Sequence, residues 1–401
     1  MPLRGPRLDL IAVLLLAACA RSDATAGVFA VNDSAGVEIA VSSSPAWATA
    51  PTRQWLIAET PVVDLTQSGD GPLHEFYRVQ DALIRSDGSI VVANSGSSEV
   101  RLYSSMGQAT GSVGREGEGP GEYRQISRLI KLPGDSIGVF SWPMRLTILA
   151  PDLTFVRTHA LGERAQSPRP LQSGDLVDLE VYPSVVEYEG ANQLIREPAA
   201  VVRRSREGVI KDTVWEGPGY EEYMYSSGKR HGAARPLFGR GPAFATRGDR
   251  TLIGTSDRME YREFDVTGAL KRVVRVAGYD LSVDQEAEDA ERAAYLGDDP
   301  SPFLRQLVAQ LPRPEGRPAY SEFIVDSEGY LWAGAYQSRR NYTEARAWEV
   351  FSPSGQWMGT LATPANFTVF EIGPDYLLGS WSDELDVEHV QRLALTRSGS
   401  G

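Results

Sequence analysis

Asp87-Gly88 followed at once by SIVVANS, residues 89–95, is the first of six copies of one pattern along the chain. A glycine-containing turn directly before a run rich in β-branched residues is typical of a β-hairpin. The five further copies are Gly134-Asp135 before SIGVFSW, Gly174-Asp175 before LVDLEVY, Gly248-Asp249 before RTLIGTS, Glu328-Gly329 before YLWAGAY and Pro374-Asp375 before YLLGSWS. Six hairpins in succession predict a repetitive, turn-rich β protein.

Each copy continues into a third strand, and the first five continue into a fourth. The sixth copy runs out of chain after VQRLALT, residues 390–396. Its missing strand is expected from the N-terminal part, either VEIAV (Val37–Val41) or WLIAETPVVDL (Trp55–Leu65), because such pairing removes exposed sheet edges. We therefore predict an all-β fold, a six-bladed β-propeller over residues 36–397 closed by an N-terminal strand. The alternative is a pair of β-sandwiches built from similar hairpins.

The spacing of the turns favours the propeller. Three intervals between successive turns are 46, 40 and 46 residues, which match the ~40–50 residues of known propeller blades. The two long intervals, 74 and 81 residues, each require an insertion of ~30 residues. One insertion covers the tyrosine-rich segment Gly217–Gly232. The other is predicted to be helical, about residues 282–312 between blades four and five, with Ser282 and Gln285 as a capping box and Pro302 in the first turn of a second helix.

The charge and the cysteine count exclude several classes of function. The chain has 401 residues, with 40 Lys and Arg against 53 Asp and Glu, for a formal net charge of −13. This acidic balance argues against nucleic acid as a partner, since nucleic acids attract basic faces. The single cysteine excludes an intramolecular disulfide framework and a cysteine-cluster metal site.

The N-terminal segment is predicted to be a targeting signal. Two arginines, Arg4 and Arg7, precede the apolar run Leu10–Ala20, which is shorter than the ~20 residues that span a bilayer. The run Leu16-Ala17-Ala18-Cys19 resembles the lipobox of bacterial lipoproteins. That resemblance implies a signal peptide at 1–18, a lipid on Cys19 and a flexible tether at 19–35. It also implies anchoring in the bacterial cell envelope, with the outer membrane expected because Ala20 stands where aspartate would signal inner-membrane retention. The alternative is an ordinary signal peptide that happens to contain a cysteine.

A second repeated pattern precedes the turns, with GDGP at 69–72 and GEGP at 117–120. In its fullest form, GREGEGPGEYR at 114–124, it resembles the NHL-like six-bladed β-propeller lipoproteins of environmental and gut bacteria. DSAGVEI at 33–39 and GSWSDELDVEHV at 379–390 are similar to the first and last blades of that family. The resemblance implies a propeller fold and export, and it implies no activity, because the family is largely uncharacterised. We interpret the glycine-rich loop as an inter-blade turn, since Pro120 and Glu122 stand where a phosphate loop needs amides or a cation.

No catalytic motif stands out. The four histidines, His74, His159, His231 and His389, form neither HExxH nor any close pair, and G-x-S-x-G is absent. We expect no cofactor and no metal site, although a divalent cation bound in the central channel stays open. The leading hypothesis is therefore an exported, non-enzymatic scaffold that binds a glycan, a peptide or an envelope protein. The alternative is a propeller lyase or hydrolase that acts on a sugar or peptide through channel residues.

The candidate binding residues are aromatic, basic or acidic side chains in loops and insertions that depart from the repeat. Aromatic rings offer stacking surfaces and arginine binds carboxylates, so such a set suits a sugar or a peptide. The set comprises Trp142, Arg145, Tyr220, Tyr223, Tyr225, Arg339, Arg340, Tyr342, Trp381 and Asp383.

Overall fold

The computed structural model describes residues 29–162, 165, 168–182, 192–227, 230–338 and 344–398. The predicted signal peptide, Cys19 and the first part of the tether lie outside these residues. In the described part of the chain, no helix is both long enough and apolar enough to cross a bilayer.

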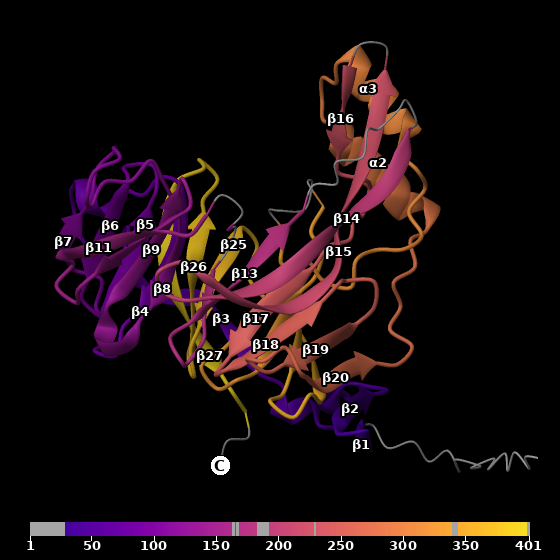
Figure 1. Cartoon of the computed structure of the whole chain (residues 1–401). Helices are drawn as coiled ribbons and strands as arrows, with labels where there is room; N and C mark the ends of the chain where they lie inside the picture. The colour runs from indigo at the N-terminus through magenta and orange to yellow at the C-terminus, as the bar shows by residue number, and fades with distance from the viewer. Residues whose placement is uncertain are drawn as a thin grey trace, which may run out of the picture.

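The described part of the chain is mainly β and forms six sheets (Figure 1). The first two sheets are β4 (Val79–Ile84), β5 (Ile90–Asn94), β6 (Glu99–Tyr103) and β7 (Ala109–Val113), and then β8 (Gln125–Lys131), β9 (Ile137–Trp142), β10 (Arg145–Leu149) and β11 (Phe155–Ala160). The third contains β12 (Arg169–Pro170), β13 (Leu176–Val181), β14 (Gln193–Arg204), β15 (Ile210–Ser227) and β16 (Arg230–Ala234).

The fourth sheet contains β17 (Ala243–Arg247), β18 (Arg250–Gly254), β19 (Glu260–Phe264) and β20 (Leu270–Val276), extended by β2 (Val37–Ser42) and β1 (Phe29–Ser34). The fifth contains β21 (Glu322–Val325), β22 (Leu331–Gly334), β23 (Ala347–Phe351) and β24 (Trp357–Ala362). The sixth contains β25 (Phe367–Ile372), β26 (Tyr376–Ser382), β27 (Glu388–Thr396) and β3 (Leu56–Asp64). Short helical segments are α1 (Ala46–Thr49) and the 3-10 turns Pro51–Arg53, Pro72–His74 and Pro133–Asp135.

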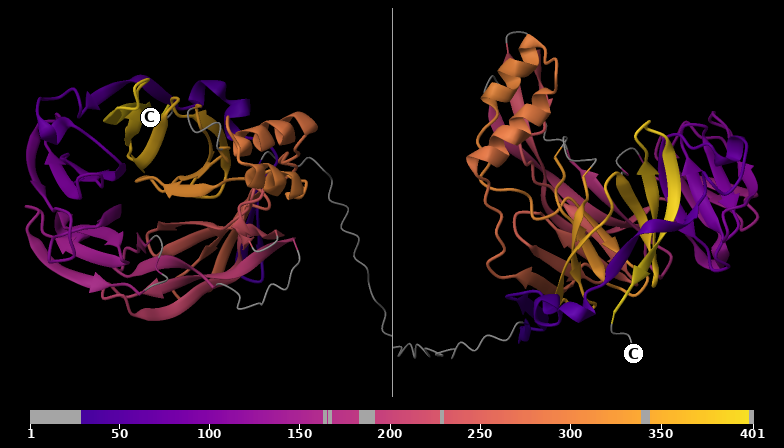
Figure 2. Two further views of the ribbon diagram at one scale, coloured as in Figure 1. Left: turned by 90° about the horizontal axis from the view of Figure 1, so that it is seen from above. Right: turned by 180° about the vertical axis from the view of Figure 1, so that it is seen from behind.

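The sheets are arranged like the blades of a β-propeller, and all six predicted turns lie where expected. Each turn joins the first and second strands of its sheet. Five of the six turns place a glycine at positive φ, for example Gly88 at 83° and Gly174 at 91°, a conformation that costs glycine little. The first strand of each sheet contacts a neighbouring sheet, with β4 touching β8 and β25, and β17 touching β12 and β21. Seen from above, the sheets surround a common centre (Figure 2).

The two candidate N-terminal strands have different places. Trp55–Leu65 supplies β3, which pairs antiparallel with β27 as the fourth strand of the sixth sheet, with Gln391 opposite Asp64. Val37–Val41 instead forms β2, which pairs parallel with β20 at the outer edge of the fourth sheet. The segment between them is held by a buried aromatic contact, with the rings of Trp47 and Trp55 5.5 Å apart.

The predicted helical insertion is present between β20 and β21 as α2 (Gln285–Leu296) and α3 (Pro302–Gln310). The expected capping box of Ser282 and Gln285 is wrong. Asp284 is the N-cap, and its carboxylate accepts the Ala287 N–H at 2.8 Å; Ser282 lies before the helix, where its backbone N–H donates to Asp280. Pro302 opens the second helix as expected.

The two predicted insertions pack on each other. The distal part of the third sheet, formed by the ends of β14 and β15 with β16, extends away from the other sheets and meets α2 and α3; we call this unit the lobe (Figure 1). Its small core is formed by Tyr223, Leu237, Phe238, Leu307, Val308 and Leu311.

Candidate functional site

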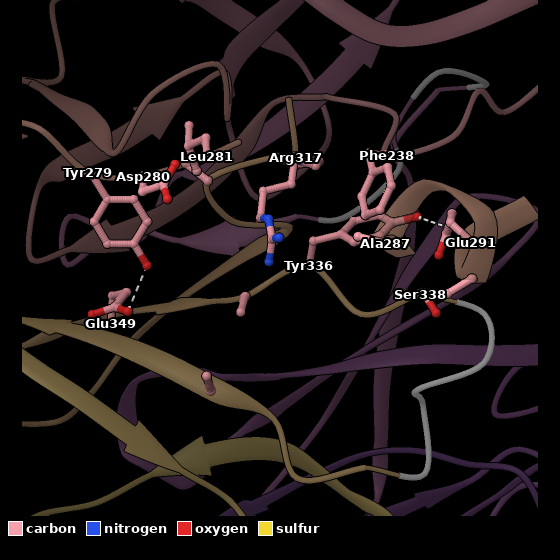
Figure 3. Close-up of a pocket in the computed structure, with 15 residues that line it drawn as sticks. Phe238, Tyr279, Asp280, Leu281, Ala287, Glu291, Arg317, Tyr336, Ser338 and Glu349 are labelled. Atoms are coloured by element: carbon pink, nitrogen blue, oxygen red, sulfur yellow. Dashed lines mark hydrogen bonds between the residues drawn. The ribbon is translucent and has the colours of Figure 1, made fainter. Parts of the chain in front are cut away.

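A pocket of about 420 Å³ lies between the lobe and the fifth sheet (Figure 3). We call it the lobe pocket. Its walls come from segments far apart in sequence: Phe238, the connection Tyr279–Leu281, helix α2, the connection Arg317–Ala319, the segment after β22, and strand β23. Most of the lining is apolar, and the short side chains of alanines from α2, β23 and the connections leave space in the pocket. Concave, largely apolar pockets with a few convergent polar groups are typical ligand sites.

One wall is built on a buried carboxylate. Glu349 on β23 is 6% exposed, and the Tyr279 hydroxyl donates to its Oε1 at 2.8 Å. Trp357 Nε1 donates to Oε2 at 2.7 Å, and the Thr360 hydroxyl lies 3.0 Å from Oε1. Burial, followed by the Glu349 charge, raises the pKa of Tyr279, so this phenol stays protonated and keeps donating. The network fixes the Tyr279 ring as a rigid wall.

The opposite wall repeats the arrangement with different residues. The Tyr336 hydroxyl donates to Glu291 Oε1 at 2.7 Å, and Glu291, on α2, is 5% exposed. The ring of Phe238 packs against Tyr336 with centroids 5.5 Å apart. Tyr336 thereby connects the fifth sheet to the lobe.

Arg317 lies between the two tyrosines, and its guanidinium is directed into the cavity (Figure 3). Its backbone N–H donates to Leu281 at 2.9 Å, and its Nε reaches the Ser282 carbonyl at 3.3 Å. Among the described residues, its two terminal nitrogens have no hydrogen-bond or ion-pair partner. The structure thus presents a positioned guanidinium edge between two aromatic walls, which suits bidentate binding of a carboxylate.

The tyrosine-rich insertion has a partly structural role. Tyr223 is 4% exposed and belongs to the core of the lobe, and the Tyr225 ring packs 5.5 Å from Phe303. Tyr220 is more open, and its ring covers the backbone of Gly241. It lines a smaller cavity of about 210 Å³ that shares Tyr336 with the lobe pocket. Of these three predicted residues, only Tyr220 lies beside the candidate site.

Four other predicted residues lie away from the lobe pocket. Trp142 ends β9 and is 49% exposed, and Arg145 begins β10, where its Nη1 donates to the Glu118 carbonyl at 2.8 Å. Trp381 belongs to β26. The Asp383 carboxylate accepts two backbone N–H groups of its own turn, at 2.8 and 2.9 Å, which gives it a structural task.

Arg339, Arg340 and Tyr342 lie outside the described residues. Ser338, directly before them in the chain, lines the lobe pocket. Two histidines of the described residues make separate contacts: His74 Nδ1 lies 2.5 Å from the Leu65 carbonyl oxygen, and His389 Nδ1 lies 3.1 Å from the Asp64 carboxylate. Across the part of the chain that the structure describes, no three His, Cys, Asp or Glu side chains gather as metal ligands would.

The sequence reasoning missed the central residues of the site, Tyr279, Arg317, Tyr336 and Glu349. The available signal was their position, because Tyr279 and Arg317 flank the helical insertion and departures from a repeat often carry specificity. The insertion stands out from the repeat, whereas the connections that enter and leave it carry no recognisable sequence pattern.

No protein-family model matches the sequence, and neither does any curated protein. Three solved structures of similar shape are a protein from Bacteroides fragilis described as exported, a member of the DUF4221 family from Bacteroides vulgatus, and a calcium-binding protein, regucalcin, from Agrobacterium tumefaciens. The first is 12% identical, with 86% of this chain and 96% of that chain covered and a TM-score of 0.49. The second is 10% identical, with 86% and 100% covered and a TM-score of 0.49. The third is 10% identical, with 84% and 95% covered and a TM-score of 0.41.

Proposed function

We propose that this chain is an exported, lipid-anchored β-propeller that binds a small carboxylate-bearing ligand in the lobe pocket and serves as a binding scaffold at the cell envelope. An acidic sugar and a peptide end are the two ligand types that offer the required chemistry.

The observation that carries the proposal is the Arg317 guanidinium, which is aimed into the pocket with both terminal nitrogens unpartnered among the described residues. A carboxylate there would form two parallel charge-assisted hydrogen bonds. The Tyr279 and Tyr336 rings on either side offer faces for a sugar ring or a peptide plane. Because Glu349 and Glu291 already accept tyrosine hydroxyls, they fix the walls of the site.

The scaffold role rests on the fold and the N-terminal segment. Pairing of β3 with β27 completes the sixth sheet with a strand from the N-terminal part of the chain, which supports a ring of six blades closed by the two ends of the propeller. The lipobox-like run before Cys19 supports export and anchoring in the envelope, with the outer membrane as the proposed location. Residues between Cys19 and β1 would then hold the propeller away from the lipid surface.

The test is a glycan and peptide array probed with the chain from Ala20 onward, followed by titration of any ligand found. Arg317→Gln should weaken binding at least tenfold, about 1.4 kcal/mol, with little change in melting temperature. Arg258→Gln is the matched control, because Arg258 is exposed and lies outside the lobe pocket. Equal affinity of the Arg317→Gln variant and the parent would place the site elsewhere.

A further inference from the structure

A second pocket, of about 360 Å³, lies at the inner strands of the propeller. It is lined from five of the six sheets, by β4, β8 and β25, by β12 with the residue before it, and by β21 with the two residues after it. We call it the inner-strand pocket. It is separate from the lobe pocket, and the two share no lining residue.

The carboxylates of this pocket are already engaged. Asp81 accepts the Ala82 and Leu129 N–H groups, each at 2.9 Å, and so joins the first sheet to the second. Glu371 accepts the Lys131 ammonium at 2.7 Å and the Ile84 N–H at 3.2 Å.

The third carboxylate, Asp326, is engaged as well. Its Oδ2 accepts Trp332 Nε1 at 2.9 Å and an Arg397 terminal nitrogen at 2.8 Å. Its Oδ1 accepts the N–H groups of its own turn. Among the described residues, none of the three carboxylates accepts a hydrogen bond from Arg128, although the Arg128 and Arg169 charges both act on Asp81.

Arg128, on β8, is the cation of the pocket on which the proposed site depends. Within the described ranges its guanidinium makes no hydrogen bond and no ion pair, although it is partly buried and lines the pocket. Arg169, on β12, lies close enough for the two positive charges to act on each other. Burial, followed by the Arg128 charge, lowers the pKa of Arg169 to about 9. The Asp81, Glu322 and Asp178 charges offset this effect on Arg169 only in part, so an anion beside Arg128 would further reduce the repulsion between the two guanidinium groups.

We propose that the inner-strand pocket binds a small oxyanion, a phosphate or a carboxylate, with Arg128 as its ligand and the nearby charge of Arg169 adding to the attraction. Arginine provides a planar fork that matches both groups, and the partly buried position of Arg128 strengthens each hydrogen bond. The pocket volume lies at the low end of the ~300–1,000 Å³ of typical ligand pockets and so suits a small molecule. This site is independent of the proposed function of the lobe pocket.

Isothermal titration of the chain from Ala20 onward with inorganic phosphate and with malonate tests the proposal and separates the two chemistries. At least one probe should bind at concentrations on the order of millimolar or below. Arg128→Gln should weaken that binding at least tenfold. Arg124→Gln should leave it unchanged, because Arg124 is exposed, pairs with Glu118 and lies outside the pocket.

Three outcomes would overturn the proposal: neither probe binds the parent, Arg128→Gln binds as the parent does, or both variants weaken binding equally. Loss of fold in Arg128→Gln is checked by its melting temperature. If that variant unfolds, Arg128→Lys should retain part of the affinity, since it keeps the charge and loses the fork. Full parent affinity or complete loss in Arg128→Lys would contradict the assignment.

Discussion

Asp81 provides a direct test of how the inner strands are packed. Burial, only partly offset by Arg128 and by backbone hydrogen bonds, raises the pKa of Asp81 from 3.8 to about 6. The folded protein therefore takes up a proton between about pH 6 and pH 4 that the unfolded chain does not. Protonation stabilises the folded state, so the unfolding free energy contributed by Asp81 rises as pH falls through 6 and is constant above about pH 7.

The magnitude follows from the two pKa values. Between pH 7.5 and pH 5, a folded pKa of about 6 against an unfolded value of 3.8 corresponds to ~1.4 kcal/mol. Other groups titrate in this range too, so the quantity to measure is the difference between parent and Asp81→Asn. Urea unfolding, followed by tryptophan fluorescence at both pH values, should show the parent gaining ~1.4 kcal/mol relative to the variant on acidification. Identical pH dependence of the two proteins, or a larger gain in the variant, would refute the buried environment assigned to Asp81.

Three further predictions concern the lobe pocket, the ring and the anchor. Glu349→Gln should lower the unfolding free energy measured in urea by ~2 kcal/mol, because the Glu349 carboxylate accepts hydrogen bonds from three donors. The control Glu315→Gln should leave it unchanged, since the Glu315 side chain is 88% exposed, and equal effects of the two variants would contradict the prediction. Deletion of residues 20–65 should cause aggregation or loss of cooperative unfolding in a thermal melt, because it removes β3. Deletion of residues 20–42 leaves β3 in place and should cause neither, and cooperative melting of both variants would contradict closure of the ring by β3. Cys19→Ser should move the protein to the soluble fraction, and a membrane-bound variant of unchanged mass would contradict lipidation.

The hairpins were predictable because their signal is local. A glycine or aspartate turn and the apolar run after it stand within nine residues, and the positive φ at Gly88 or Gly174 depends on chemistry at that position. Which of the two N-terminal segments completes the sixth sheet depends on residues far away in the sequence. β2 and β3 both contain enough apolar residues to form a strand, and the partner of β3 lies more than 300 residues later, at Gln391 opposite Asp64.

The site was less predictable than the fold. Arg317 lies in a proline-containing connection with no periodic pattern, and it meets Tyr279 and Tyr336 only once the lobe has packed on the fifth sheet. The aromatic residues that stood out in sequence, Tyr223 and Tyr225, were used to build the lobe. A tyrosine in an insertion can serve packing or binding, and composition alone does not separate the two.

A crystal structure with a ligand from the array tests the central claim most directly. We expect the ligand carboxylate about 2.8 Å from the terminal nitrogens of Arg317, with the ligand body between the rings of Tyr279 and Tyr336. A ligand bound elsewhere, with the Arg317 guanidinium still unpartnered, would contradict it.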